Sequence, residues 1–148
     1  MKKQINILVI ILVAILFVGC QSYKRDTAPG KIIEISLDDA IEKSKTEDEI
    51  ILLFTQSTCK DCINLKKIVN PYLENHNIKI NEVILDNEGT SDEEIQNNRE
   101  KINSIFPKFN STPSMYYLED GKIIDEIFEV TNEKELDEWV MRNKLDLK

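Results

Sequence analysis

The stretch from Ile50 to Cys62 constrains the fold of this chain most. It begins with five apolar residues, Ile50–Phe54, which suit a strand buried on both faces of a sheet. A short polar step follows, and then two cysteines, Cys59 and Cys62, with two residues between them. If a helix begins at the first cysteine, the second lies almost one turn further on and faces the same side. The stretch therefore predicts a strand, a turn and a helix that carries two neighbouring sulfur atoms.

The position of these cysteines predicts redox chemistry. In the first turn of a helix, Cys59 is close to unpaired backbone N–H groups and to the positive end of the helix dipole. Both favour the thiolate, so the pKa of the thiol should fall below its usual value of about 8.5. Because Cys62 is within reach, the two sulfurs can form a disulfide or open again with little backbone movement. We therefore interpret the pair as a redox site.

The N-terminus resembles a targeting segment. Lys2 and Lys3 precede a 13-residue run of apolar and small residues, Ile7–Gly19, which is too short to span a bilayer comfortably and fits a secretory signal. The run ends in Leu16–Cys20, which resembles a bacterial lipobox with phenylalanine in place of the usual leucine. We expect residues 1–19 to be removed and Cys20 to receive lipid, which would hold the protein on the extracytoplasmic face of the cell membrane. The alternative is an uncleaved signal anchor.

The number of cysteines agrees with a lipid-carrying Cys20 and a separate redox pair. The chain has three cysteines, and assigning Cys20 to lipid leaves one pair for redox work. A structural zinc site needs four ligands, whereas only two thiols and the single histidine, His76, would remain. We expect neither a metal nor another cofactor.

Charge and length restrict the function classes further. The chain has 148 residues, with 27 acidic against 19 basic residues and a net charge of −8. This balance argues against nucleic acid as a partner and against electrostatic attachment to anionic lipid. Residues 20–31 are polar, include Pro29 and Gly30, and are expected to form a tether. Residues 32–148 are long enough for one domain with one core.

Strand and helix patterns alternate along this domain. The expected strands are Ile32–Ile35, Ile50–Phe54, Ile78–Leu85, Met115–Leu118 and Lys122–Val130. The expected helices cover Leu37–Lys45, the segment from the cysteines to about Leu73, the segment from Ser91 to Phe106, and the segment after Thr131 or Asn132. Pro71 should kink or restart the second of these helices. The order predicts an α/β fold of three layers, α/β/α, with a mixed, mostly parallel sheet that ends in an antiparallel hairpin.

With these residues in place, the chain resembles the thioredoxin family over roughly residues 32–144. Three features carry the resemblance: Thr58–Cys62 after a buried strand, Ser111–Ser114 at the start of the penultimate strand, and the hairpin Glu119–Lys122. The chain looks most like small exported or membrane-tethered thioredoxin-like proteins, including the bacteriocin transport accessory group. The resemblance implies a thioredoxin fold and thiol–disulfide oxidoreductase activity.

The resemblance also implies roles for individual residues. Cys59 would be the attacking thiolate and Cys62 the resolving thiol of a redox-active disulfide. Pro113 would be cis and would pack opposite the disulfide, and the backbone of Thr112 would pair with an extended substrate. The implied partners are exported proteins or peptides that contain thiols or disulfides, together with a membrane redox partner that recycles the cysteines.

The chain departs from thioredoxins proper in three places. Thr58 replaces the tryptophan before the first cysteine, and Lys60 and Asp61 replace the Gly-Pro pair between the cysteines. Leu53 takes the place of the buried aspartate that helps to move a proton. Glu82, in the following strand, is either a substitute for that carboxylate or a solvent-facing or salt-bridged residue.

Two hypotheses follow for the function. In the first, the protein is a lipid-anchored enzyme that exchanges disulfides with exported proteins or peptides. In the second, it is a non-enzymatic lipoprotein that binds a partner, for instance in bacteriocin export or immunity, and Cys59–Cys62 is a structural disulfide. The direction of electron flow stays open, because Lys60 should favour the Cys59 thiolate and Asp61 should oppose it.

Overall fold

The computed structural model describes residues 23–148. The predicted signal peptide, residues 1–19, and the predicted lipid attachment site at Cys20 lie outside this range. In chain order, the elements are β1 (Lys31–Glu34), α2 (Leu37–Thr46), β2 (Glu49–Thr55), α3 (Lys60–Leu73), β3 (Lys79–Ile84), the short 3-10 helix η1 (Leu85–Asn87), α4 (Asp92–Ile105), β4 (Ser114–Glu119), β5 (Lys122–Ile127) and α5 (Glu133–Asn143). Within residues 23–148, none of the helices has the length and apolar character needed to cross a bilayer.

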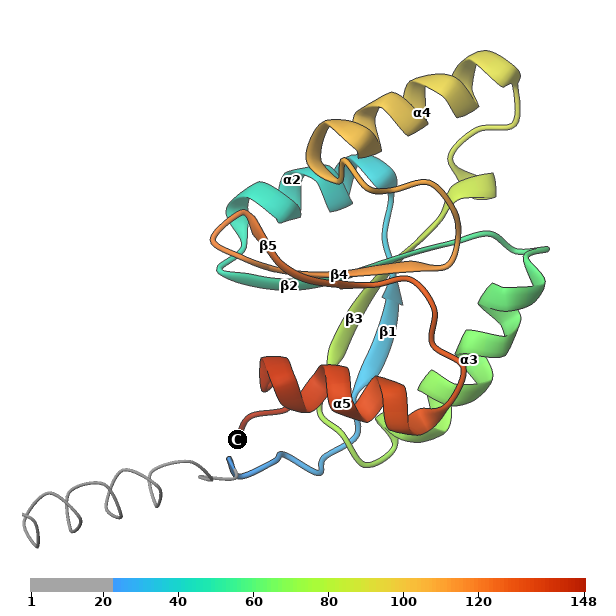
Figure 1. The fold of residues 1–148 in the computed structure, drawn as a ribbon. Helices are drawn as coiled ribbons and strands as arrows, with labels where there is room; N and C mark the ends of the chain where they lie inside the picture. The colour runs from blue at the N-terminus through green and yellow to red at the C-terminus, as the bar shows by residue number, and fades with distance from the viewer. Residues whose placement is uncertain (1–22) are drawn as a thin grey trace, which may run out of the picture.

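The five strands form one sheet in the order β1-β3-β2-β4-β5. Strands β1, β3 and β2 are parallel, while β4 runs antiparallel to β2 and β5 runs antiparallel to β4. Helices α3 and α5 cover one face of the sheet, and α2 and α4 cover the other (Figure 1). This arrangement confirms the predicted three-layer α/β/α fold with a mixed sheet and a final antiparallel hairpin.

Strand β2 lies at the centre of the sheet and is buried on both faces. Ile51 and Leu53 point into the core under α3 and α5, and Ile50, Leu52 and Phe54 point into the core under α2 and α4. Alternate residues of β2 therefore pack against the two opposite layers of helices. This double burial explains why the sequence of β2 is a continuous apolar run rather than an alternating one.

The helix ends largely follow the predicted signals. The side chain of Ser36 caps α2, Ser91 and Glu94 form a complete capping box at α4, and Asn132 caps α5. Pro71 lies in the last turn of α3, which continues for two more residues, so no second helix restarts there. Pro71 does not break the helix as predicted, because a proline this close to the helix end removes few of the backbone hydrogen bonds within the helix.

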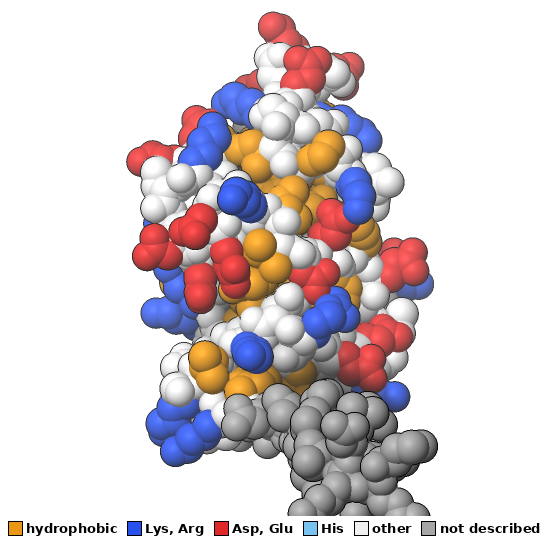
Figure 2. Space-filling model, turned by 60° about the vertical axis from the view of Figure 1, so that its left-hand side comes forward, with side chains coloured by type: hydrophobic (Ala, Val, Ile, Leu, Met, Phe, Trp, Pro, Cys, Tyr) orange, Lys and Arg blue, Asp and Glu red, His pale blue; other side chains and the backbone are white. Residues whose placement is uncertain are grey.

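The edge strand β5 is partly exposed and ends at Ile127, three residues earlier than predicted. The side chain of Ile124 is 49% exposed, but charged side chains flank it along the strand. In the space-filling view of Figure 2, exposed hydrophobic side chains are likewise interrupted by side chains of both charge signs. Charges of this kind keep an edge strand from pairing with other chains.

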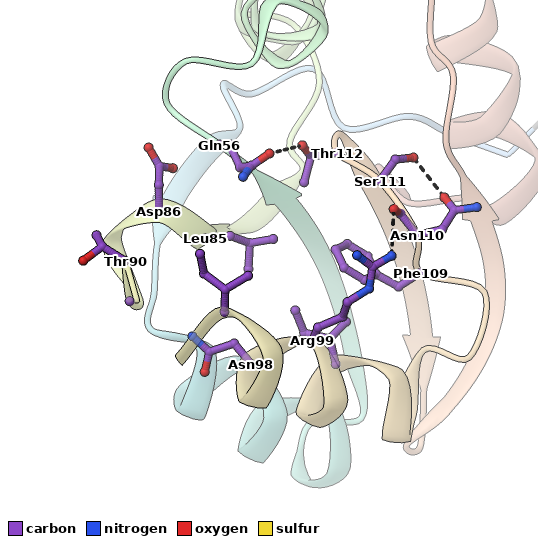
Figure 3. A pocket seen from close by; sticks show the side chains of 13 residues that line it. Gln56, Leu85, Asp86, Thr90, Asn98, Arg99, Phe109, Asn110, Ser111 and Thr112 are labelled. Carbon is purple, nitrogen blue, oxygen red and sulfur yellow. Dashed lines mark hydrogen bonds between the residues drawn. The ribbon is translucent and has the colours of Figure 1, made fainter. Parts of the chain in front are cut away.

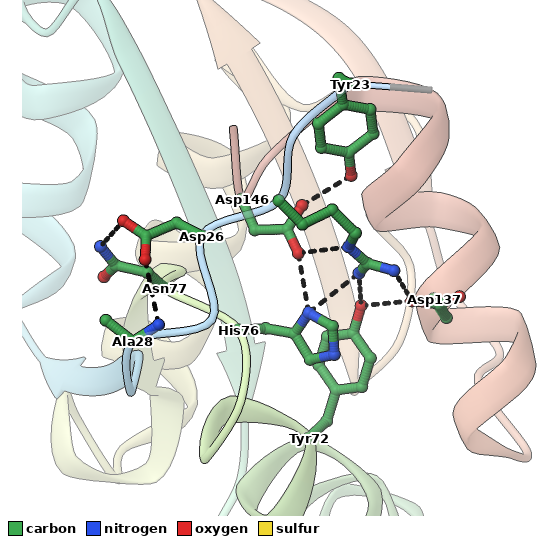
Figure 4. A network of polar contacts seen from close by, with 9 residues as sticks. Tyr23, Asp26, Ala28, Tyr72, His76, Asn77, Asp137 and Asp146 are labelled. Carbon is green, nitrogen blue, oxygen red and sulfur yellow. Dashed lines mark hydrogen bonds and ion pairs between the residues drawn. The ribbon is translucent and has the colours of Figure 1, made fainter. Parts of the chain in front are cut away.

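The segment that precedes β1 is fastened to the domain by a polar network (Figure 4). Arg25 lies at its centre: its Nε is 2.7 Å from Asp146, its Nη1 is 2.7 Å from Asp137, and its Nη2 donates to the Tyr72 hydroxyl at 2.6 Å. The Tyr23 hydroxyl donates to the other oxygen of Asp146 at 2.6 Å. Residues 23–31 belong to the segment that we expected to be a tether, but here they contact both α3 and the C-terminal segment.

His76 completes the network. Its ring stacks on Tyr72 with the ring centroids 3.9 Å apart, and its Nδ1 lies 2.7 Å from Asp146. The side chain of Asp146 is fully buried. Burial alone would raise the pKa of Asp146, but hydrogen bonds from Tyr23, His76 and Arg25 outweigh it, so the pKa lies below its ordinary value.

We expect the substitution Asp146→Asn to lower the free energy of unfolding at pH 7 by about 2 kcal/mol, because charge-assisted hydrogen bonds are lost in a buried place. A carboxylate with a depressed folded-state pKa stabilises the protein above its unfolded pKa of about 3.9, and this contribution disappears as the pH falls through the folded pKa. The difference in the free energy of unfolding between wild type and variant should therefore shrink below about pH 4. Urea unfolding at a series of pH values measures it.

A matched control is Asp38→Asn, because the side chain of Asp38 is 82% exposed and pairs only with Lys101 at the surface. This control should change the free energy of unfolding by less than about 0.5 kcal/mol. Equal stabilities of the Asp146 and Asp38 variants would contradict a clamping role for the network.

Candidate redox site

The two cysteines meet at the start of α3. Cys59 is the residue that caps the helix, Cys62 lies in its first turn, and the two form a disulfide with their Cα atoms 5.2 Å apart. Cys62 is only 1% exposed, whereas Cys59 is partly exposed. An incoming molecule therefore reaches Cys59 and not Cys62.

Backbone groups surround the sulfur of Cys59. The N–H of Cys62 donates a hydrogen bond to this sulfur at 3.1 Å, and the carbonyl oxygen of Thr112 lies 3.6 Å from it. In the reduced protein, the same N–H and the helix start would stabilise a thiolate on Cys59. The physical basis that the sequence suggested for an acidic thiol is thus present in the geometry.

The loop before β4 faces the disulfide. The Thr112–Pro113 peptide bond is cis, and the hydroxyl of Thr112 donates to the side-chain oxygen of Gln56 at 3.0 Å. Gln56 directly follows β2, so this bond joins the loop to the turn that leads to Cys59. Sequence analysis missed Gln56, because a glutamine in a polar turn carries no signal of its own.

A second contact holds the same turn. Asp86 of η1 accepts hydrogen bonds from the backbone N–H of Ser57, at 2.8 Å, and from the Ser57 hydroxyl. These bonds, first from the side chain and then from the backbone of Ser57, lower the pKa of Asp86 below its ordinary value. The turn between β2 and α3 is therefore tied to β3's end on one side and to the cis-proline loop on the other.

Glu82 is salt-bridged and buried. It is 4% exposed, it pairs with Leu53 in the register of β2 and β3, and it accepts a hydrogen bond from Thr55 at 2.5 Å. Its carboxylate also lies 2.7 Å from Nζ of Lys66, which follows the second cysteine by one turn of α3. Its hydrogen-bond and ion-pair partners are thus Thr55 and Lys66, and not a cysteine.

His76 lies at the other end of α3 from the cysteines, within the network around Arg25. Across residues 23–148, no three His, Cys, Asp or Glu side chains are grouped so that they could hold a metal ion.

The arrangement defines a class: an α/β domain with a disulfide at a helix start, opposite a cis-proline loop. No family model matches the chain, and no curated protein matches it. The chain does match solved structures. The chain is similar to a mutant thioredoxin from Halobacterium salinarum NRC-1, with a TM-score of 0.56 and 14% identity, over 82% of this chain and 96% of that one.

Two further structures give the same result. A thioredoxin from Malassezia sympodialis has a TM-score of 0.57 and 13% identity, over 78% of this chain and 92% of its own. Thioredoxin O1 from Arabidopsis thaliana in the oxidised state has a TM-score of 0.54 and 13% identity, over 78% of this chain and 97% of its own. These likenesses and the sheet order establish the thioredoxin fold.

After reduction, we expect Cys59 to react with iodoacetamide at pH 6 about tenfold faster than a free thiol such as glutathione, because its thiolate is stabilised. Mass spectrometry of the alkylated peptides measures both sites. In the Cys59→Ser variant, the buried Cys62 should react more slowly than the free thiol. A Cys59 that alkylates no faster than glutathione would contradict the stabilisation inferred from the helix start.

Proposed function

We propose that this protein is a thiol–disulfide oxidoreductase that exchanges disulfides with exported proteins or peptides. The observation that carries the proposal is the partly exposed Cys59 at the head of α3, beside the cis-proline loop and bonded to the buried Cys62. A structural disulfide needs neither the helix start nor the exposure of one sulfur. The thioredoxin fold supports the same chemistry at a general level.

In the reducing direction, the Cys59 thiolate attacks one sulfur of a substrate disulfide. A mixed disulfide forms, and the other substrate sulfur leaves as a thiolate that takes up a proton. Cys62 then loses its proton and attacks the sulfur of Cys59, which releases the second substrate thiol and leaves the Cys59–Cys62 disulfide. The substrate disulfide gains two electrons, and the cysteine pair loses them. Oxidation of a substrate dithiol is the reverse of these steps.

The loop before β4, with Thr112 and Pro113, would position the substrate. The carbonyl oxygen of Thr112 is 3.6 Å from the sulfur of Cys59, so an extended chain that pairs with this backbone brings its own sulfur next to Cys59. The bond between Thr112 and Gln56 holds the loop in that position. A membrane partner that carries thiols or disulfides would recycle the pair.

We further propose that lipid on Cys20 anchors the protein at the extracytoplasmic face of the membrane. Three residue steps from Cys20 to Tyr23 span at most about 10 Å, so the network around Arg25 would lie close to the membrane surface. Helix α3 has 14 residues and is about 20 Å long, with Cys59 at its start and Tyr72 in its last turn. The redox site would therefore face away from the membrane, toward exported substrates.

The anchor is tested by cell fractionation. Wild-type protein should remain in the membrane fraction, and a Cys20→Ser variant should be found uncleaved or released rather than lipidated. Metabolic labelling with a clickable fatty acid reads the lipid directly. Equal labelling of wild type and variant would contradict the assignment of Cys20.

The exchange reaction is tested by trapping. In a Cys62→Ser variant, the mixed disulfide on Cys59 cannot resolve, so covalent complexes with exported proteins should accumulate and disappear on reduction. A Cys59→Ser, Cys62→Ser variant is the control and should capture nothing. An absence of complexes, together with full activity of the double variant in its own cell, would favour a binding lipoprotein with a structural disulfide instead.

A further inference from the structure

A cavity of about 370 Å³ opens beside the redox site, between α4, η1 and the loop before β4 (Figure 3). Its floor is apolar and includes Leu85, Ile102 and Phe109. Gln56 and Thr112, the pair that faces Cys59, form part of its wall. A molecule bound at the sulfur of Cys59 therefore has this cavity within reach.

Arg99 brings a positive charge to the cavity. Its Nη2 donates to the carbonyl oxygen of Asn110 at 3.3 Å, and within residues 23–148 it forms no salt bridge. The other two arginines of the chain, Arg25 and Arg142, are both paired with aspartates. In a chain with 27 acidic residues, an arginine without a carboxylate partner leaves its remaining donors available to a ligand.

The residues that line the cavity provide little negative charge to balance Arg99. Asp86 is the only carboxylate among its lining residues, and both oxygens of Asp86 already accept hydrogen bonds from Ser57. The other hollow beside the cis-proline loop differs, because the carboxylates of Asp61 and Glu129 line it together with Lys67 and Lys108. The cavity at Arg99 thus combines an apolar floor with a cation that forms no salt bridge within residues 23–148.

We propose that this cavity is a substrate subsite that selects an apolar side chain and a carboxylate two residues apart, which share one face of an extended peptide, close to its reactive cysteine. The inference rests on the proposed function and adds a substrate class to it. In an extended chain, residues within three positions of the cysteine lie about 10 Å or less from it. The apolar side chain fills the floor, and the guanidinium of Arg99 binds the carboxylate through two parallel hydrogen bonds.

The test uses short peptides that each carry one cysteine in a mixed disulfide with a chromogenic thiol. Leu-Gly-Glu, Leu-Gly-Gln, Leu-Gly-Lys or Ala-Gly-Glu is placed directly before or after the cysteine. The second-order rate of exchange with reduced protein is measured at low salt. Wild type should react with the Leu-Gly-Glu peptide about tenfold faster than with the Leu-Gly-Lys peptide on one side of the cysteine, and the preference should weaken with salt.

Two variants separate the two parts of the subsite. Arg99→Gln should abolish the preference for glutamate and keep the preference for leucine over alanine. Ile95→Ser should weaken the preference for leucine and keep the one for glutamate, because Ile95 lines the cavity and is 52% exposed, so its loss should not unfold the protein. Arg142→Gln, which removes an arginine far along the chain on α5, is the matched control and should change neither.

A small disulfide without flanking residues, hydroxyethyl disulfide, is exchanged in parallel. Its rate should be the same for wild type and all three variants. No glutamate preference in wild type, or the same preference in Arg99→Gln, would overturn the subsite. No exchange with either the small disulfide or the peptides would instead overturn the proposed function, so the two failures are distinguishable.

Discussion

The burial of β2 between two layers of helices is the constraint on which the rest of the structure depends. Because both faces of this strand are covered, its apolar residues cannot slip in register without exposing one set of them. The strand must therefore end at Thr55, where the polar turn begins, and α3 must start a fixed distance beyond it. The place of Cys59 relative to the sheet follows from this packing rather than from the cysteines themselves.

Helix α3 connects two polar sites that have different tasks. Its start holds the disulfide, and its last turn contributes Tyr72 to the network around Arg25. Between them the helix buries an apolar face against the sheet and α5, so the two ends form one rigid unit. This division places stability at one end, in a buried carboxylate with several donors, and the proposed chemistry at the other, where Cys59 is partly exposed.

Much of the fold and part of the site could be predicted from local sequence signals. The run Ile50–Phe54, the capping box at Ser91 and the hairpin turn each depend on residues close together in the chain, and the structure has them as expected. A salt bridge was one of the roles expected for Glu82, but its partner Lys66, the network around Arg25 and the cavity at Arg99 could not be predicted. Each joins residues from distant segments, and a charged residue in a sequence does not reveal which partner it will meet.

The central claim is that Cys59–Cys62 is an exchanging disulfide and not a structural one. Equilibration of the protein with mixtures of reduced and oxidised glutathione, followed by alkylation and mass spectrometry, measures the reduction potential of the pair. The account predicts a potential above about −300 mV, within the range of disulfides that exchange with thiols. A pair that stays oxidised at every glutathione ratio, with a potential well below that value, would contradict it.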